Sequence, residues 1–191
     1  INEYGLITAV INTYAPALDC TVKLPQIEHN QHEISTPDVI YQIVKDTPIE
    51  LPALLAMWLS LTESEILGLT KSKSISSDGC YITIKEVIVK DEHNNAVVKN
   101  KGKQPTRDRT LRLPEYLKQL IDKVETDQLV TLSGTALSKR FNRLITKAGI
   151  PHMTFHDLRH VNASVMAVLR IPDKYAQERG GWKTDHIMKS T

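Results

Sequence analysis

Apolar side chains recur every three or four residues over most of the chain, which is the spacing of helices with one buried face. Leu54, Leu55, Trp58 and Leu61 show this spacing clearly. The predicted helices span residues 1–18, 37–44, 47–61, 115–124, 133–147, 154–169 and 171–180. This pattern predicts a protein that is mainly α-helical.

Several of these segments begin with the residues that commonly cap helices. Pro37 follows Ser35 and Thr36, and proline is favoured at the first helical position. A capping box has Ser or Thr followed three residues later by an acid. Such pairs occur at positions 47 and 50, 62 and 65, and 154 and 157. Each pair predicts the start of a helix.

Between Cys80 and Leu113 the spacing of apolar residues changes from the helical repeat to an alternation of apolar and polar positions. One strand is expected over residues 81–89, a second from residue 96, and a third over 110–113, with a turn at residues 93–95. We therefore expect an α+β fold, mainly α, with a small three-stranded antiparallel sheet.

The residues between the first and second predicted helices are polar, and their few apolar side chains show neither helical nor alternating spacing. Residues 25–34 are interpreted as a linker, because they contain Pro25 and carry no apolar face. The predicted organisation is a helix within residues 1–24, this linker, and a main domain over residues 35–191.

The composition is that of an ordinary soluble globular protein, with 41% hydrophobic and 24% charged residues among 191. Cys20 and Cys80 lie far apart and without metal-type spacing, which argues against a disulfide framework and favours a reducing cytoplasm. The sequence has neither a signal-peptide layout nor an apolar run long enough to cross a bilayer, so no membrane partner is expected.

Positive charge gathers in two places although the net charge is only +2. Residues 99–112 contain one acid, Asp108, against Lys or Arg at positions 99, 101, 103, 107, 109 and 112. The helix over 133–147 carries Lys139, Arg140, Arg143 and Lys147 on one face. Both clusters suit phosphate contacts, and a solvated hairpin tip or helix face is the alternative.

His156 and Arg159 lie three residues apart at a predicted helix start, so they emerge from neighbouring positions. The backbone N–H groups and the helix dipole favour an anion at such an end. The alternative is an ordinary first turn with a solvated arginine and a half-buried histidine.

Two segments of the sequence resemble motifs of the tyrosine recombinase (phage integrase) family. The first is Thr154-Phe155-His156-Asp157-Leu158-Arg159-His160. The second, about twenty residues later, is Gln177-Glu178-Arg179-Gly180-Gly181-Trp182. The resemblance extends from about Ser35 onward. It implies the helical catalytic domain of a site-specific DNA recombinase, which breaks and rejoins DNA through a 3′-phosphotyrosyl intermediate to integrate or excise a mobile element. It also implies that the first helix is the tail of a core-binding domain, and a helix packed on the catalytic core is the alternative.

The resemblance further implies the residues and partners of the reaction. The catalytic candidates are Lys103, His156, Arg159 and Trp182, with Lys101 as the alternative to Lys103. The DNA-binding candidates are Lys99, Lys101, Arg107, Arg109, Lys139, Arg140 and Arg143. Double-stranded DNA attachment sites and a homotetramer on two duplexes are the implied partners. No metal, ATP or other cofactor is implied.

The sequence departs from the family pattern at two points. Thr62 stands where the family has the first of two phosphate-clamping arginines, and threonine cannot supply a fixed cation. The family's nucleophilic tyrosine is expected just after Thr191. A catalytically impaired DNA-binding protein with the same fold is therefore the main alternative. A metal-dependent hydrolase that uses His156 and His160 is the second.

Overall fold

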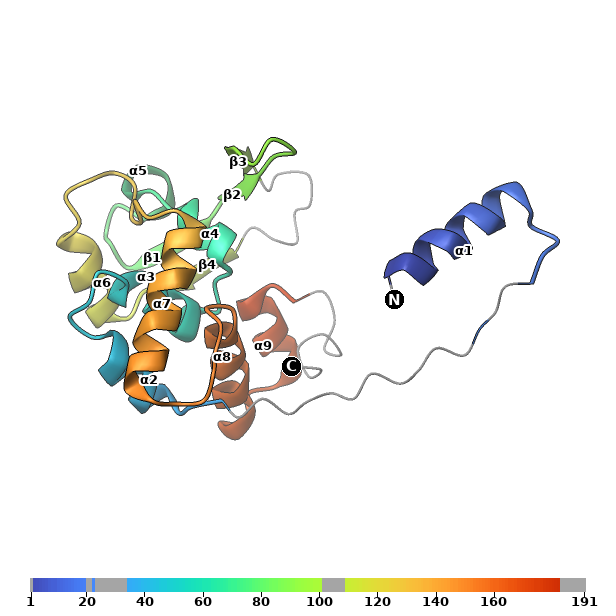
Figure 1. The fold of residues 1–191 in the computed structure, drawn as a ribbon. Coiled ribbons are helices and arrows are strands. Elements are labelled where there is room, and N and C mark those ends of the chain that lie inside the picture. The colour runs from blue at the N-terminus through green and yellow to red at the C-terminus, as the bar shows by residue number, and fades with distance from the viewer. Residues whose placement is uncertain (1, 20–21, 23–33, 101–108, 183–191) are drawn as a thin grey trace. The chain divides into compact units, whose positions relative to one another are not determined.

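A computed structural model of the chain describes residues 2–19, 22, 34–100 and 109–182. The chain divides into two compact units, residues 1–32 and 33–191, each described by itself. In the first unit, α1 (Asn2–Tyr14) leaves Leu6, Ile7 and Val10 largely exposed. The second unit combines helices with short antiparallel strands (Figure 1), which confirms the predicted α+β, mainly α class.

The helices of the second unit form where the apolar spacing predicts them, and two further short helices follow α3. The elements are α2 (Pro37–Val44), α3 (Glu50–Leu59), α4 (Glu63–Leu67), α5 (Lys71–Ser74), β1 (Tyr81–Ile84), β2 (Glu86–Lys90), β3 (Ala96–Asn100), β4 (Arg109–Arg112), α6 (Glu115–Asp122), α7 (Gly134–Ala148), α8 (Asp157–Val168) and α9 (Asp173–Gly180). Within the described residues, no helix has the length and apolar character needed to cross a membrane.

The predicted capping boxes have different outcomes. Thr62 and Glu65 form a complete box at the start of α4, as predicted. The box at Thr47 is wrong, because α3 begins later, at Glu50, whose carboxylate accepts hydrogen bonds from the Asp46 N–H and the Tyr116 hydroxyl. These two bonds hold Glu50 in a buried position despite its charge.

The start of α8 is also later than predicted. The helix begins at Asp157, and Thr154 lies in the turn before it. The Asp157 carboxylate accepts from the N–H and the hydroxyl of Thr154, at 2.7 and 2.9 Å. The turn allows Phe155 to be buried against Phe141, with ring centroids 5.7 Å apart. Thr154 and Asp157 therefore make one of the two bonds of the predicted box, in a turn that precedes the helix.

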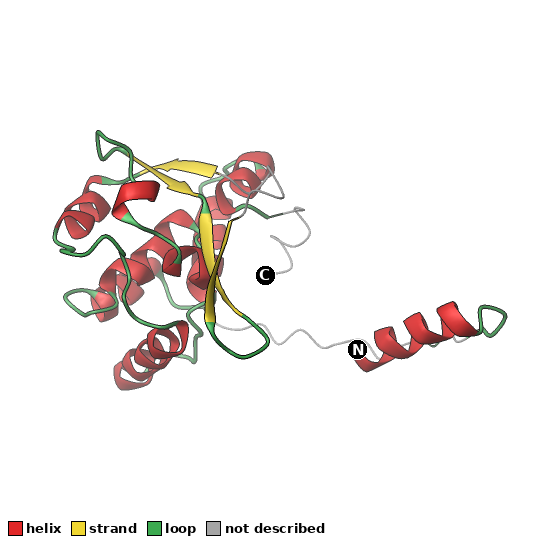
Figure 2. Ribbon diagram, turned by 90° about the horizontal axis from the view of Figure 1, so that it is seen from above, coloured by secondary structure: helices red, strands yellow, loops and turns green. Residues whose placement is uncertain are grey.

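The strands form two separate antiparallel pairs instead of a single three-stranded sheet (Figure 2). Strand β1 pairs with β4, where Ile82 lies opposite Leu111, and β2 pairs with β3, where Ile88 lies opposite Val98. The predicted strand over residues 81–89 is interrupted at Lys85. Its two halves pair with different partners, and Ile82 and Ile84 point into the core.

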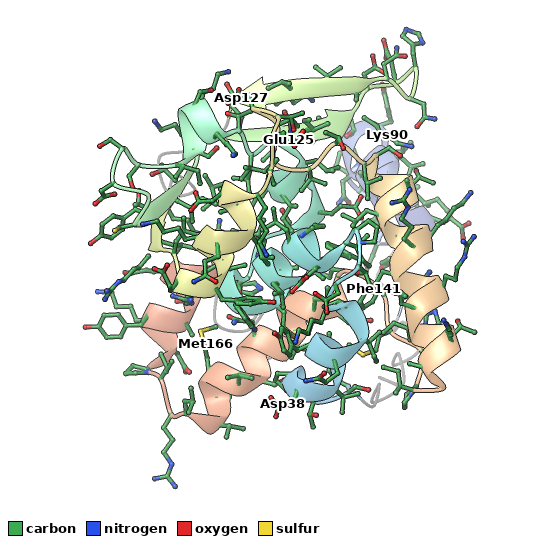
Figure 3. All side chains as sticks on the ribbon, turned by 90° about the vertical axis from the view of Figure 1, so that its left-hand side faces the viewer. Asp38, Lys90, Glu125, Asp127, Phe141 and Met166 are labelled. Atoms are coloured by element: carbon green, nitrogen blue, oxygen red, sulfur yellow. The ribbon has the colours of Figure 1, made fainter. Side chains whose placement is uncertain are left out.

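Helix α3 lies at the centre of the hydrophobic core. All its residues except Trp58 are buried, and α8, α6 and α2 pack against it. Helix α7 contributes the fully buried Phe141, which points inward from the helix (Figure 3). Because α3 has almost no exposed face, its C-terminal end must find hydrogen-bond donors within the protein.

Candidate functional site

The C-terminal end of α3 is the point at which several distant segments meet. Ser60 terminates the helix in a left-handed conformation, with φ 56° and ψ 32°, and is completely buried. The last carbonyl groups of a helix have no partner within the helix, and the helix dipole makes this end negative. Positively charged donors are favoured at such an end.

Asn162 of α8 supplies neutral donors to these carbonyl groups. Its Nδ2 donates to the Met57 oxygen at 2.7 Å and to the Trp58 oxygen at 3.2 Å. Its Oδ1 accepts from the Ser60 hydroxyl at 2.6 Å. This buried amide therefore fixes the position of Ser60 relative to α8.

Three arginines from other elements complete the end of α3, and we call Arg109, Arg159 and Arg179 the arginine cluster. Arg159 Nη1 donates to the Ser60 carbonyl oxygen, and Arg109 Nη2 approaches the same oxygen at 3.4 Å. Arg179 Nη2 donates to the Trp58 oxygen at 2.9 Å. Two guanidinium groups thus converge on a single carbonyl oxygen.

Arg159 is held on two sides. Its side chain is buried, and its Cζ lies 4.3 Å from the centre of the Trp182 ring, in the range of a cation–π contact. Burial lowers the pKa of Arg159 to about 10, and the nearby Arg109 contributes to this shift. The guanidinium remains protonated near neutral pH, so Arg159 is a fixed cation.

The two glycines before Trp182 make this arrangement possible. A Cβ on Gly180 would lie 1.9 Å from the Trp182 ring, and Gly181 adopts φ +67°. A Cβ on Gly181 would lie 2.8 Å from Arg109 Nη1. Side chains at these positions would collide with the indole or with the arginine cluster.

Arg109 lies in a different setting from the exposed basic loop that the sequence predicts for it. It is the first residue of β4, and its side chain is only 9% exposed. Its Nη1 and Nη2 each donate to one oxygen of Glu65 at 2.9 Å, a bidentate ion pair. Glu65 also accepts from the Thr62 N–H, so Arg109 is connected to the start of α4.

His156 and His160 lie one turn apart, in the residue before α8 and within it. Their ring centroids are 4.8 Å apart in an edge-to-face arrangement. His156 is exposed, and the desolvation of its ring by the surrounding protein lowers its pKa, with a further contribution from Arg159. Burial, and next the neighbouring His156, lower the pKa of His160 to about 4. Both imidazoles are therefore neutral at neutral pH.

The two histidines have no further metal-binding partner in the part of the chain that the structure describes. No group of three or more His, Cys, Asp or Glu residues there is arranged to hold a metal ion. The pair lies beside Arg159, whose positive charge is felt by both imidazoles. A pair of neutral imidazoles beside a fixed guanidinium suits hydrogen bonding to an anion.

The predicted DNA-binding residues are distributed over two elements. Lys99 is exposed on β3, and Lys139, Arg140 and Arg143 are exposed on α7, whose first turn is capped by Ser133. Lys101, Lys103 and Arg107 lie outside the described residues. The DNA contacts of all these residues stay predictions.

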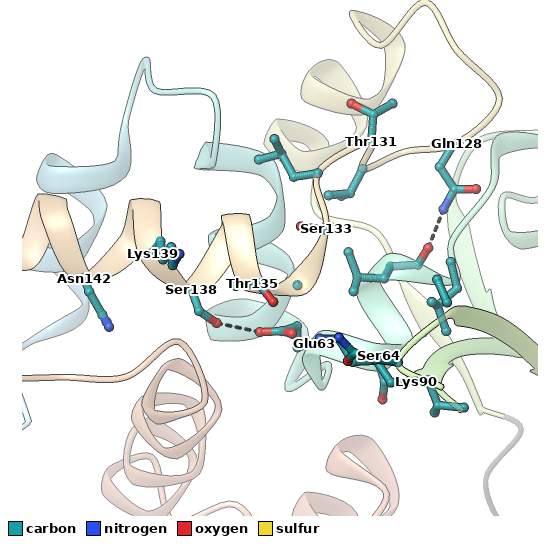
Figure 4. Close-up of a pocket in the computed structure, with 18 residues that line it drawn as sticks. Glu63, Ser64, Lys90, Gln128, Thr131, Ser133, Thr135, Ser138, Lys139 and Asn142 are labelled. Atoms are coloured by element: carbon teal, nitrogen blue, oxygen red, sulfur yellow. Dashed lines mark hydrogen bonds between the residues drawn. The ribbon is translucent and has the colours of Figure 1, made fainter. Parts of the chain in front are cut away.

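A separate cavity of about 1070 Å³ lies between α4, the β2–β3 pair and the start of α7. Glu63 lies in its wall and accepts from the Ser138 hydroxyl at 2.8 Å, while Gln128 donates to the Leu67 oxygen (Figure 4). None of the described residues that line it belongs to the arginine cluster. Its wall is mixed polar and apolar.

Sequence reasoning missed the residues that organise the site. Ser60 has no distinctive sequence context, Arg179 lies in the quoted segment 177–182 without a predicted role, and the pairing of Arg109 with Glu65 spans 44 residues. One signal in the sequence was the isolated polar Asn162 among the apolar positions of α8. An uncompensated asparagine on a buried helix face indicates a hydrogen-bonding role.

Comparisons with known proteins agree with this fold. The chain matches the model of the phage integrase family over residues 53–190. None of the curated proteins with which it was compared is a match. Its fold is similar to that of the Tn1549 transposon integrase in complex with a circular intermediate DNA, with a TM-score of 0.81 and 16% identity over 99% of this chain and 72% of that chain.

Two further solved structures have a similar fold. The XerA recombinase has a TM-score of 0.63 and 16% identity, over 98% of this chain and 69% of that chain. A lambda integrase dimer bound to a COC′ core site has a TM-score of 0.62 and 17% identity, over 98% and 69%.

Proposed function

The chain belongs to the phage integrase family, and from this premise we propose that it is the catalytic part of a site-specific DNA recombinase. The observation that carries the proposal is the convergence of Arg159, Arg109 and Trp182 at the end of α3. These donors come from three separate parts of the chain and lie beside two neutral imidazoles. Similar folds in integrases bound to DNA support the same function.

The chemistry requires a site that stabilises negative charge. A phosphodiester under attack gains charge on its non-bridging oxygens, and preorganised donors stabilise that charge most effectively. Arg159 provides a guanidinium already fixed by Ser60 and Trp182. The indole N–H of Trp182 is a further donor. Such donors need no reorientation during the reaction.

The proposed reaction is a transesterification. A tyrosine hydroxyl attacks the phosphorus, a phosphotyrosyl bond forms, and the bond from phosphorus to the 5′ oxygen breaks. Neutral His156 takes the tyrosine proton, and Lys103 gives a proton to the departing 5′ oxygen. The reverse step, with the 5′-hydroxyl of a partner strand, rejoins the DNA. The proposed reaction consumes no ATP and uses no metal ion.

The biological role follows from the exchange of strands. A recombinase of this type integrates or excises a mobile element, and it acts on double-stranded attachment sites as a homotetramer that holds two duplexes. The exposed basic residues of α7 and β3 are assigned to phosphate contacts outside the reacting position. We place this activity in the cytoplasm.

The test is a covalent-trapping experiment with the full-length protein. An attachment site is first selected from random duplexes by binding, and a nick is then placed so that the cleaved fragment with the 5′-hydroxyl dissociates. A protein–DNA adduct that survives boiling in detergent is expected. Arg159→Ala is expected to bind the duplex and to form at least about a hundredfold less adduct.

A catalytically impaired DNA-binding protein is the second candidate, because Thr62 carries no charge and is engaged in the capping box of α4. The same experiment separates the two candidates. Specific binding of the selected site without any adduct, from a protein that contains the tyrosine, identifies the binding protein and excludes the recombinase.

A further inference from the structure

Arg109 has both terminal nitrogens committed, to Glu65 and in part to the Ser60 oxygen, while its Nε has no partner among the described residues. Both terminal nitrogens donate to Glu65, which occupies the end of the guanidinium. The remaining edge includes Nε, which is buried and has no hydrogen-bond partner among the described residues. A guanidinium has five N–H donors, and its two edges can bind two different oxyanions at once.

A buried donor without an acceptor is unfavourable, and in native proteins such a group commonly has a ligand or a functional role. Two other features explain why an anion is the suitable ligand here. Arg109 lies close enough to Arg159 to lower its pKa, and both arginines approach the Ser60 oxygen. Arg109 is paired bidentately with the carboxylate of Glu65, whose charge also acts on Arg159.

The position of Arg109 also agrees with the rest of the site. Its Nη1 lies beside Gly181, and the next residue, Trp182, stacks on Arg159. Glu65 accepts from the Thr62 N–H, so Arg109 is fixed next to the position where the family carries a phosphate-clamping arginine. Thr62 itself cannot bind an anion through a guanidinium fork.

On the basis of the recombinase function proposed above, we propose that Arg109 replaces the arginine that Thr62 lacks. Glu65 holds the end of the guanidinium, and the Nε edge of Arg109 donates to a non-bridging oxygen of the scissile phosphate. Arg159 donates to the same phosphate from the other side. The chain thus keeps a two-arginine site, with the second arginine supplied by β4.

The test compares two substrates that differ at one phosphate. One suicide duplex carries the normal scissile phosphodiester, and the other carries an uncharged methylphosphonate there. Arg109→Gln is expected to lower the rate of adduct formation by about 10²–10³-fold on the phosphodiester. On the methylphosphonate the loss is expected to be under about tenfold, because the charge that Arg109 stabilises is absent. An equal loss on both substrates overturns the proposal, since a purely structural role affects both alike.

Matched variants control for folding. Arg109→Gln leaves Glu65 buried without its partner, so the double variant Glu65→Gln with Arg109→Gln is also measured, and it is expected to show the same substrate dependence. Arg170→Gln removes an exposed arginine that follows α8, outside both basic clusters, and is expected to leave both rates unchanged. If the double variant folds and cleaves the phosphodiester at the normal rate, Arg109 has no part in phosphate binding.

The outcome for Arg109 is separable from the outcome for the proposed function. If the wild-type full-length protein forms no adduct, the recombinase proposal fails. The affinity for duplexes with and without the single methylphosphonate then tests Arg109 alone. The wild type is expected to prefer the charged duplex, and Arg109→Gln is expected to lose that preference. An unchanged preference contradicts the assignment.

Discussion

Arg109 Nη1 occupies the space next to Gly181, where an added Cβ would lie only 2.8 Å away. The same glycine has φ +67°, a conformation that costs other residues free energy. Glycine is therefore required at position 181 for two reasons, the positive φ of the backbone and the close approach of Arg109. The two requirements can be measured separately, because Gly149 has φ +68° and an added Cβ there would meet no atom within 4 Å.

Gly181→Ala is expected to destabilise the protein more than Gly149→Ala. The Gly149 variant shows the backbone cost alone, about 1–2 kcal/mol. The Gly181 variant adds displacement of Arg109 from Glu65, for a total of roughly 3 kcal/mol or more. Urea denaturation measures both free energies of unfolding. Equal values for the two variants would mean that Arg109 moves aside without cost.

The buried ion pair between Glu65 and Arg109 gives a second prediction. Their side chains are 7% and 9% exposed, so Glu65→Gln leaves a buried guanidinium without its carboxylate. We expect a loss of about 3–5 kcal/mol in the free energy of unfolding, measured by urea denaturation. Lys73 and Glu86 form an ion pair in which Lys73 is 59% exposed, so Lys73→Gln is expected to cost under about 1 kcal/mol. Similar losses for the two variants would contradict a stabilising role for the buried pair.

The lowered pKa of His160 predicts a dependence of stability on pH. The ordinary pKa is 6.5 and the folded pKa is about 4, so the unfolded chain binds more protons between these values. Stability is therefore expected to fall as the pH decreases from about 6.5 to about 4, and to be unaffected by this group above 6.5. His156, Asp157 and Arg159 are the neighbours whose charges act on this imidazole.

Thermal unfolding at several pH values tests this expectation. His160→Asn removes the titrating group, and its melting temperature is expected to fall less steeply between about pH 6.5 and 4.5 than that of the wild type. His152→Asn, at an exposed histidine before α8, serves as the control. A His160 variant with an unchanged slope would show that His160 titrates alike in the folded and unfolded chains.

The basic face of α7 predicts the salt dependence of DNA binding. If Lys139, Arg140 and Arg143 bind phosphates, replacing all three with Gln reduces the slope of log K against log salt by about 0.9 for each phosphate that is no longer neutralised. The control is a variant in which three lysines outside α7, at positions 118, 123 and 174, are replaced with Gln. Fluorescence anisotropy at several salt concentrations measures both slopes. If the α7 variant and the control variant have equal slopes, the basic face of α7 is not part of the DNA interface.

The features that the sequence predicts correctly are local ones. Apolar spacing gives the helices, because a buried stripe is a property of a single segment. The Thr62 box is also correct, since its bonds join residues three positions apart. The predicted start of α8 is too early, because residues 155–156 form a turn and the helix begins at Asp157. The single sheet is wrong because Lys85 separates two different pairings.

The sequence alone determined the longer helices, the short antiparallel region that interrupts them, and the motifs that resemble a recombinase. The tertiary structure decided which side chains share a site. Ser60 meets Arg159 across 99 residues, and Asn162 meets Met57 across 105. The physical reason is that a buried helix end must find donors, and their source depends on how distant elements pack.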